Sequence, residues 1–105
     1  MIVKMHELST ALSAAEMADF VMFINTMAEK LIANKDKGGW KFDSVKSLRA
    51  RINDELSELD SCIANDADQI VTVREAADVA NFLMMVAGNY CVDRLVRSID
   101  KERGA

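Results

Sequence analysis

Apolar residues recur every three to four positions from residue 17 to residue 32, which is the spacing of one face of an α-helix. Ser13 followed by Glu16 has the form of a capping box, so the helix is predicted to begin after Ser13 and to end near Asn34. Its apolar face is a stripe widened on both sides: Met17, Phe20, Ile24, Met27 and Leu31, with Val21, Phe23, Ala28 and Ile32. A face of this width needs more than one neighbouring helix to cover it.

The same period predicts a second helix that ends near Ala64. Asp43 or Ser44 can cap its first turn, since both carry a side-chain oxygen that accepts from backbone N–H groups. Its apolar stripe follows the helical repeat closely: Val45, Leu48, Ile52, Leu56, Leu59 and Ile63. A polar, acidic turn at 65–69 follows it.

A third helix is predicted after that turn. Thr72 with Glu75 repeats the capping-box pattern, which places the start of the helix near Val73. From 79 to 87 the segment is apolar on almost every side, which is typical of a helix at the centre of an assembly. Gly88 is expected either to bend the helix or to divide it in two.

The chain therefore belongs to the all-α class, as a single domain over residues 1–105. It has no alternating strand pattern, no proline and only four glycines, which favours long uninterrupted helices. Three long helices are expected, or four if Gly88 breaks the last. Half of the 105 residues are hydrophobic, more than one small core can bury, so we expect the helical bundle to be completed by dimerisation.

Charge and composition limit the partners. The net charge of −4 argues against a nucleic-acid backbone, and the longest apolar runs are too short to span a membrane. No signal-peptide pattern is present, and Cys62 and Cys91 fit no metal-binding spacing. We expect free thiols and a cytoplasmic protein.

Four acids occur as two pairs, Glu55 with Glu58 and Glu75 with Asp78. Residues three apart lie on the same side of a helix, and the sixteen residues between the pairs, 59–74, are enough for one helix to end and the next to run back beside it. Four carboxylates brought together would repel one another strongly unless a cation lay among them. Each acid also has a structural interpretation: Glu75 can cap the third helix, and any one pair can be surface charge.

Oxygen ligands favour a hard divalent metal, Mg²⁺ with Mn²⁺ as a substitute, which characteristically bridges to substrate phosphates. With His6 as the only histidine, neither a zinc site nor a serine- or cysteine-histidine nucleophile can be assembled. A di-iron bundle would need Glu-x-x-His pairs, which are absent. The chemistry that remains is hydrolysis of a phosphoanhydride.

The one clear break between helices lies at 34–43, where a double glycine precedes the only tryptophan. Lys37 and Lys41 could contact phosphate, and Trp40 could stack on a base. The alternative is that Trp40 anchors the loop to the core while both lysines are solvated.

The spacing Glu55-x-x-Glu58, sixteen residues, Glu75-x-x-Asp78 resembles the signature of the all-α nucleoside triphosphate pyrophosphohydrolases of MazG type. Glu-Leu-Ser-Glu-Leu at 55–59 and Ala-Asp-Val-Ala-Asn-Phe at 77–82 look like the text around that signature. Lys-Gly-Gly-Trp at 37–40 is similar to a segment found in short, phage- or mobile-element-type members. The resemblance covers about 37–88, half of the chain.

The resemblance implies that the four acids hold magnesium and that one of them orients the attacking water. It implies cleavage of (deoxy)nucleoside triphosphates between the α and β phosphates, giving monophosphate and pyrophosphate, as in nucleotide-pool house-cleaning. Asn81 matches the position that contacts sugar or base in related dimeric dUTPases, and Lys37, Trp40 and Lys41 become substrate-binding candidates. Protomers of the family pair so that both chains frame each site, as homodimers or homotetramers.

Two alternatives stay open. The same fold could act on dUTP specifically or on phosphoribosyl-ATP, or the chain could be a non-catalytic helical interaction module. Longer members of the family carry basic residues well after the signature, and Arg94 and Arg97 are the only counterparts suggested in this chain. A basic face near the C-terminus of a helix is also common where that helix end is solvated.

Overall fold

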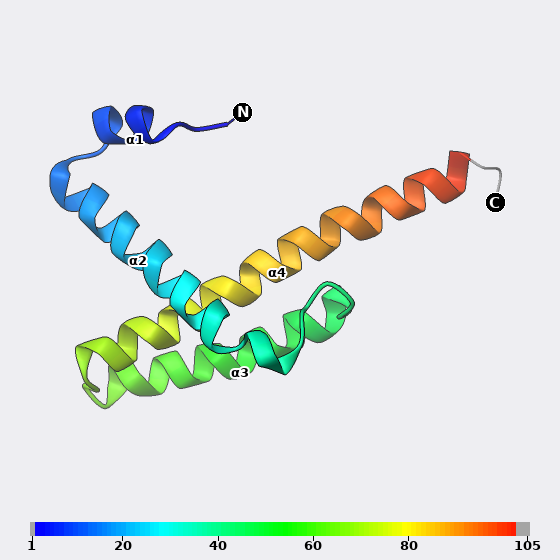
Figure 1. Ribbon diagram of the computed structural model, residues 1–105. Coiled ribbons are helices and arrows are strands. Elements are labelled where there is room, and N and C mark those ends of the chain that lie inside the picture. The colour runs from blue at the N-terminus through cyan, green and yellow to red at the C-terminus, as the bar shows by residue number, and fades with distance from the viewer. Residues whose placement is uncertain (1, 103–105) are drawn as a thin grey trace.

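The computed structural model describes residues 2–102, and within that range it contains helices and no strand (Figure 1). The elements are α1 (Met5–Ala11), α2 (Ala14–Ala33), the short 3-10 helix η1 (Lys35–Lys37), α3 (Val45–Ala64) and α4 (Gln69–Glu102). The predicted all-α class is confirmed. None of the helices in this range is both long and apolar enough to cross a membrane.

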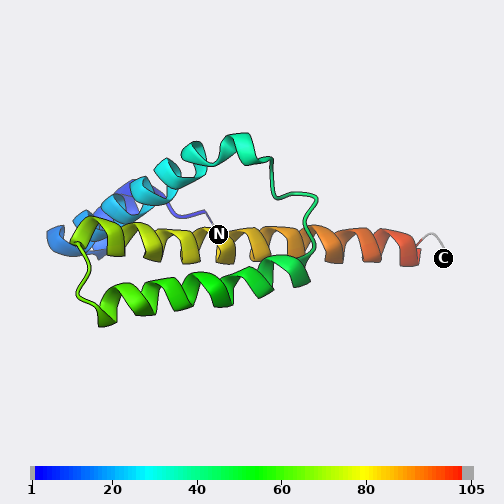
Figure 2. The ribbon, with the colours of Figure 1, turned by 90° about the horizontal axis from the view of Figure 1, so that it is seen from below.

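Helix α4 is the central element. It packs against α3 and against α2, and Figure 2 shows it lying between the two, with α3 antiparallel beside it. At about 1.5 Å per residue, its 34 residues span about 50 Å, which accounts for the longest dimension of the molecule, 54 Å. Its last turns extend beyond the N-terminal end of α3 (Figure 2).

The predicted starts of α2 and α3 are confirmed. Ser13 Oγ accepts from the Glu16 N–H at 3.1 Å, and Glu16 Oε1 accepts from the Ser13 N–H at 2.8 Å, which completes the capping box. Ser44, rather than Asp43, caps α3 by accepting from the Ser47 N–H at 3.0 Å.

The predicted start of the last helix near Val73 is wrong. Helix α4 begins four residues earlier, at Gln69, because Asp68 Oδ1 accepts from the Ile70 N–H at 2.9 Å and so satisfies a donor of the first turn. The Thr72 N–H bonds to the Asp68 carbonyl inside the helix, so Thr72 is not a cap. Glu75 is therefore free of the capping role.

Gly88 neither ends nor divides α4, which continues to Glu102. The adjacent Asn89 is 3 % exposed and is held by two hydrogen bonds from its side chain, so this part of α4 is fixed by tertiary contacts despite the weak helix propensity of glycine. The short helix α1 was not predicted. It has no buried residue and no side-chain cap, so neither of the usual sequence signals marks it.

The buried apolar core is small, with Leu48 and Ile52 from α3 and Ala77 and Val79 from α4. Much of the predicted stripe of α2 stays exposed, for example Ile24 at 49 %. The radius of gyration is 17.2 Å, whereas a compact domain of this length has about 13 Å. The single chain is an open arrangement of helices with uncovered apolar faces.

Candidate functional site

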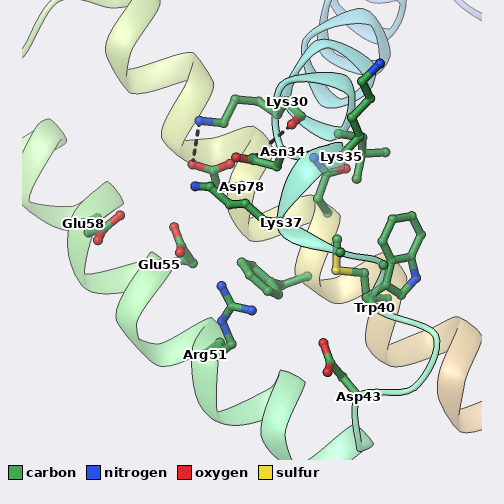
Figure 3. Close-up of a pocket in the computed structure, with 16 residues that line it drawn as sticks. Lys30, Asn34, Lys35, Lys37, Trp40, Asp43, Arg51, Glu55, Glu58 and Asp78 are labelled. Carbon is green, nitrogen blue, oxygen red and sulfur yellow. Dashed lines mark hydrogen bonds and ion pairs between the residues drawn. The ribbon is translucent and has the colours of Figure 1, made fainter.

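The four acids singled out by their spacing come together where α3 and α4 lie side by side. Glu55, Glu75 and Asp78 each place a carboxylate oxygen within 4.8 Å of the other two. Glu58 lies one turn along α3 from Glu55, and Figure 3 shows both turned toward Asp78. The i, i+3 spacing on antiparallel neighbours therefore produces the cluster expected from it.

Crowding of the acids changes their protonation. Burial raises the pKa of Glu55 to about 7, and the negative charges of Glu58 and Asp78 add to the rise. Burial also raises the pKa of Glu75, again with Glu58 and Asp78 contributing. Carboxylates held this close without a cation favour the protonated form, because the charged forms repel one another.

Glu75 has an oxygen without a partner. Its Oε2 is buried, and among the described residues nothing donates a hydrogen bond to it. A buried carboxylate oxygen left unpaired costs free energy, which a bound cation would offset. All three atoms of the cluster are oxygens, the donor set that Mg²⁺ and Mn²⁺ prefer, so the residues present fit such an ion.

One cation already contacts the cluster. Lys30, in the last turn of α2, places its Nζ 3.2 Å from Asp78 Oδ2, and both side chains are 18 % exposed. This ion pair joins the last turn of α2 to the first third of α4, on which α2 packs, and a dashed line in Figure 3 marks it.

Glu55, Glu58 and Asp78 line a pocket of about 300 Å³, whereas Glu75 belongs to the acid cluster but does not line the pocket. Four basic residues line the same pocket: Lys30, Lys35, Lys37 and Arg51. The pocket is also lined by Trp40 and Phe82, and the Arg51 guanidinium lies 4.4 Å from the centre of the Phe82 ring. Acids, cations and aromatic faces thus converge on one cavity of the size that small ligands occupy.

Asn89 holds the loop that closes one end of the pocket. Its Nδ2 donates to the Trp40 carbonyl at 2.8 Å and to the Asp43 carbonyl at 3.0 Å. Trp40 lines the pocket and is partly buried, so the loop both anchors the ring and presents it to the cavity.

The predicted substrate-binding residues are only partly brought together. Lys37, Trp40 and Asn81 line the pocket, whereas Lys41 does not and has its Nζ close to Gly88 of α4. Asn81 is 4 % exposed; its Nδ2 donates to the Met27 carbonyl at 3.1 Å, and its Oδ1 has no partner among the described residues.

Sequence reasoning missed Lys30, Lys35 and Arg51 as pocket residues. Arg51 was already on the helical line of Glu55 and Glu58, so its place one turn before Glu55 was a usable signal. Lys30 lies in the last turn of α2 and Lys35 begins η1, and only the packing of α2 on α4 brings this part of the chain to the acids.

Comparison with known proteins adds nothing to this geometry. No protein-family model, no curated protein and no solved structure matches the chain. The resemblance to MazG-type enzymes therefore rests only on the sequence motifs at 37–88 and their spacing.

Proposed function

We propose that this protein is a magnesium-dependent hydrolase that converts (deoxy)nucleoside triphosphates to monophosphate and pyrophosphate. The observation that carries the proposal is one pocket at which an oxygen-only acid cluster and several basic side chains converge. A metal–triphosphate complex has the matching charges, because its metal suits the acids and its phosphates suit the cations.

Glu55, Glu75 and Asp78 would hold the ion, since their oxygens already lie within reach of one another. Bound Mg²⁺ neutralises phosphate charge and lowers the pKa of a coordinated water. Glu58 is exposed beside this group and its charge acts on both Glu55 and Glu75. We assign to it the remaining task, which is to orient the attacking water and accept its proton.

The other pocket residues would bind the substrate. Lys35 and Lys37, which line the pocket, would contact the phosphates, and the Trp40 ring offers a stacking surface for a base. The buried Asn81 Oδ1 is a free acceptor for a sugar hydroxyl or a base N–H. The sequence resemblance at 37–88 is the basis for two parts of this proposal. These are cleavage between the α and β phosphates and a preference for dNTPs over dUTP or phosphoribosyl-ATP.

We also propose that the active form is a dimer or a dimer of dimers. The chain exposes 8061 Å², about 2,200 Å² more than a compact monomer of its mass. Uncovered apolar residues occur on the two helices beside the pocket, including Ile24 on α2 and Leu83 and Leu95 on α4. Covering this surface needs an interface of the size seen in obligate dimers.

A non-catalytic helical module would share these exposed apolar faces. It would not explain the acids, because carboxylates whose pKa values are raised by burial and by one another make the fold less stable at neutral pH. Their convergence beside a pocket favours a catalytic role.

The test is product analysis with a panel of NTPs and dNTPs, dUTP and phosphoribosyl-ATP, with Mg²⁺ and with EDTA. We expect monophosphate and pyrophosphate, formed only with the metal. Diphosphate and phosphate as products would show that another bond is cut. No turnover of any compound by folded protein would overturn the proposal.

A further inference from the structure

Lys30 occupies a position that a bound metal would contest. Its ammonium lies 3.2 Å from Asp78 Oδ2, an oxygen of the candidate metal-binding group, and the pair is largely shielded from solvent, with each side chain 18 % exposed. Its charge also opposes the rise in the pKa of Glu75 that burial and the neighbouring acids cause. In the absence of a metal, Lys30 is thus the counter-ion of the cluster.

A divalent ion and this ammonium cannot share the site without cost. Both would lie within a few ångströms of one carboxylate, where two cations repel and the low exposure limits screening. The flexible four-carbon stem of lysine allows the ammonium to move while the backbone of α2 stays in place.

The pocket provides a second place for the ammonium. Lys30 lines the same cavity as Lys35 and Lys37, in which a triphosphate would lie next to the acids. A phosphate oxygen attracts an ammonium as strongly as a carboxylate does, and it arrives only with the nucleotide.

We propose that Lys30 makes metal binding depend on the nucleotide: it pairs with Asp78 when the pocket is empty and with a phosphate when the metal–triphosphate complex is bound. This inference rests on the proposed function. It adds that the protein binds the metal–nucleotide complex rather than the free metal ion. Metal and triphosphate then bind with positive coupling, each raising the affinity for the other.

The test is calorimetric titration of wild type, Lys30→Met and Lys30→Arg, first with Mn²⁺ alone and then with Mn²⁺ and a non-hydrolysable triphosphate analogue. Without nucleotide, Lys30→Met should bind Mn²⁺ roughly tenfold more tightly than wild type, because a neighbouring positive charge is gone. With the analogue it should bind roughly tenfold more weakly, because a phosphate contact is gone. Lys30→Arg keeps the charge and should stay close to wild type in both titrations.

Lys35→Met is the matched control, since Lys35 lines the same pocket as Lys30 but, unlike Lys30, makes no ion pair with Asp78. It should weaken analogue binding and leave the affinity for Mn²⁺ alone unchanged. Unchanged or weaker binding of Mn²⁺ alone by folded Lys30→Met would overturn the proposal, as would unchanged analogue binding. If wild type hydrolyses no triphosphate yet Lys30→Met still binds Mn²⁺ more tightly, the proposed function fails while the competition between Lys30 and metal stands.

Discussion

Asn89 is expected to be the residue that fixes the pocket loop in place. It lies 3 % exposed in α4, and its Nδ2 donates to two carbonyls, those of Trp40 and Asp43. Its Oδ1 has no partner among the described residues, so the substitution Asn89→Ala removes the two donated bonds and no other hydrogen bond of this side chain. The loop would then be tied to α4 by packing alone.

Each of these bonds contributes about 1 kcal/mol, so their loss costs about 2 kcal/mol. Alanine is the better helix former by about 0.5 kcal/mol, which offsets part of the loss. A net destabilisation of about 1.5 kcal/mol should lower the Tm of a chain of this length by roughly 10 °C. Because Trp40 loses its anchor, KM should rise as well, by more than kcat falls.

The assay is thermal unfolding at one fixed protein concentration, since dimerisation makes Tm depend on concentration. Asn25→Ala is the control: Asn25 is an exposed helical residue that bonds only to Glu29 in the same helix, and its Tm should stay within about 3 °C of wild type. A Tm for Asn89→Ala equal to that of the control would refute the view that these two bonds hold the loop.

Three further predictions follow from the burial and charge of single residues. Burial and the neighbouring acids raise the pKa of Glu55 from 4.5 to about 7. The metal-free protein should therefore lose stability between pH 4.5 and 7, because this carboxyl ionises in the unfolded chain while the folded protein keeps it protonated. Tm in EDTA should fall across that range less steeply for Glu55→Gln than for wild type, and equal slopes would contradict the assignment. Gly88→Ala should stabilise α4 by about 0.5–1 kcal/mol, because a Cβ there would meet only Lys41 Nζ, at 3.8 Å; a lower Tm would show that this space is needed. Leu95→Asp should convert the oligomer to a monomer, because this side chain is 62 % exposed on the uncovered end of α4; light scattering over a concentration series measures this. Ile2→Asp, at an exposed residue outside the helices, should leave the oligomer intact. A wild type that is monomeric at every concentration would rule out the dimer.

The acids were predictable because their geometry is local. A spacing of three fixes two carboxylates on one side of a helix, and a short connection brings the second helix back alongside. The capping signals at Ser13 and Ser44 were equally local, and the structure confirms both. The same signal misled at Thr72, because Asp68 caps the helix four residues earlier and sequence pattern does not rank two competing caps.

The basic residues of the pocket were not predictable in the same way. Lys30 comes to Asp78 only through the packing of α2 on α4, a contact between residues 48 positions apart. The loop posed a related question, whether Trp40 anchors the segment or faces a ligand. The structure shows the loop held by Asn89 and the ring lining the cavity, so the two roles are compatible.

The most direct test of the central claim compares Mg²⁺-dependent pyrophosphate release by wild type, Asp78→Asn and Asp60→Asn. Asp78 belongs to the acid cluster, whereas Asp60 is an exposed acid of α3 outside the pocket, and both substitutions remove one negative charge. Asp78→Asn should lower kcat/KM by roughly a hundredfold or more with the helical fold retained, and Asp60→Asn should leave it unchanged. Equal activity of the two variants would show that the acids are surface charge and not the site of hydrolysis.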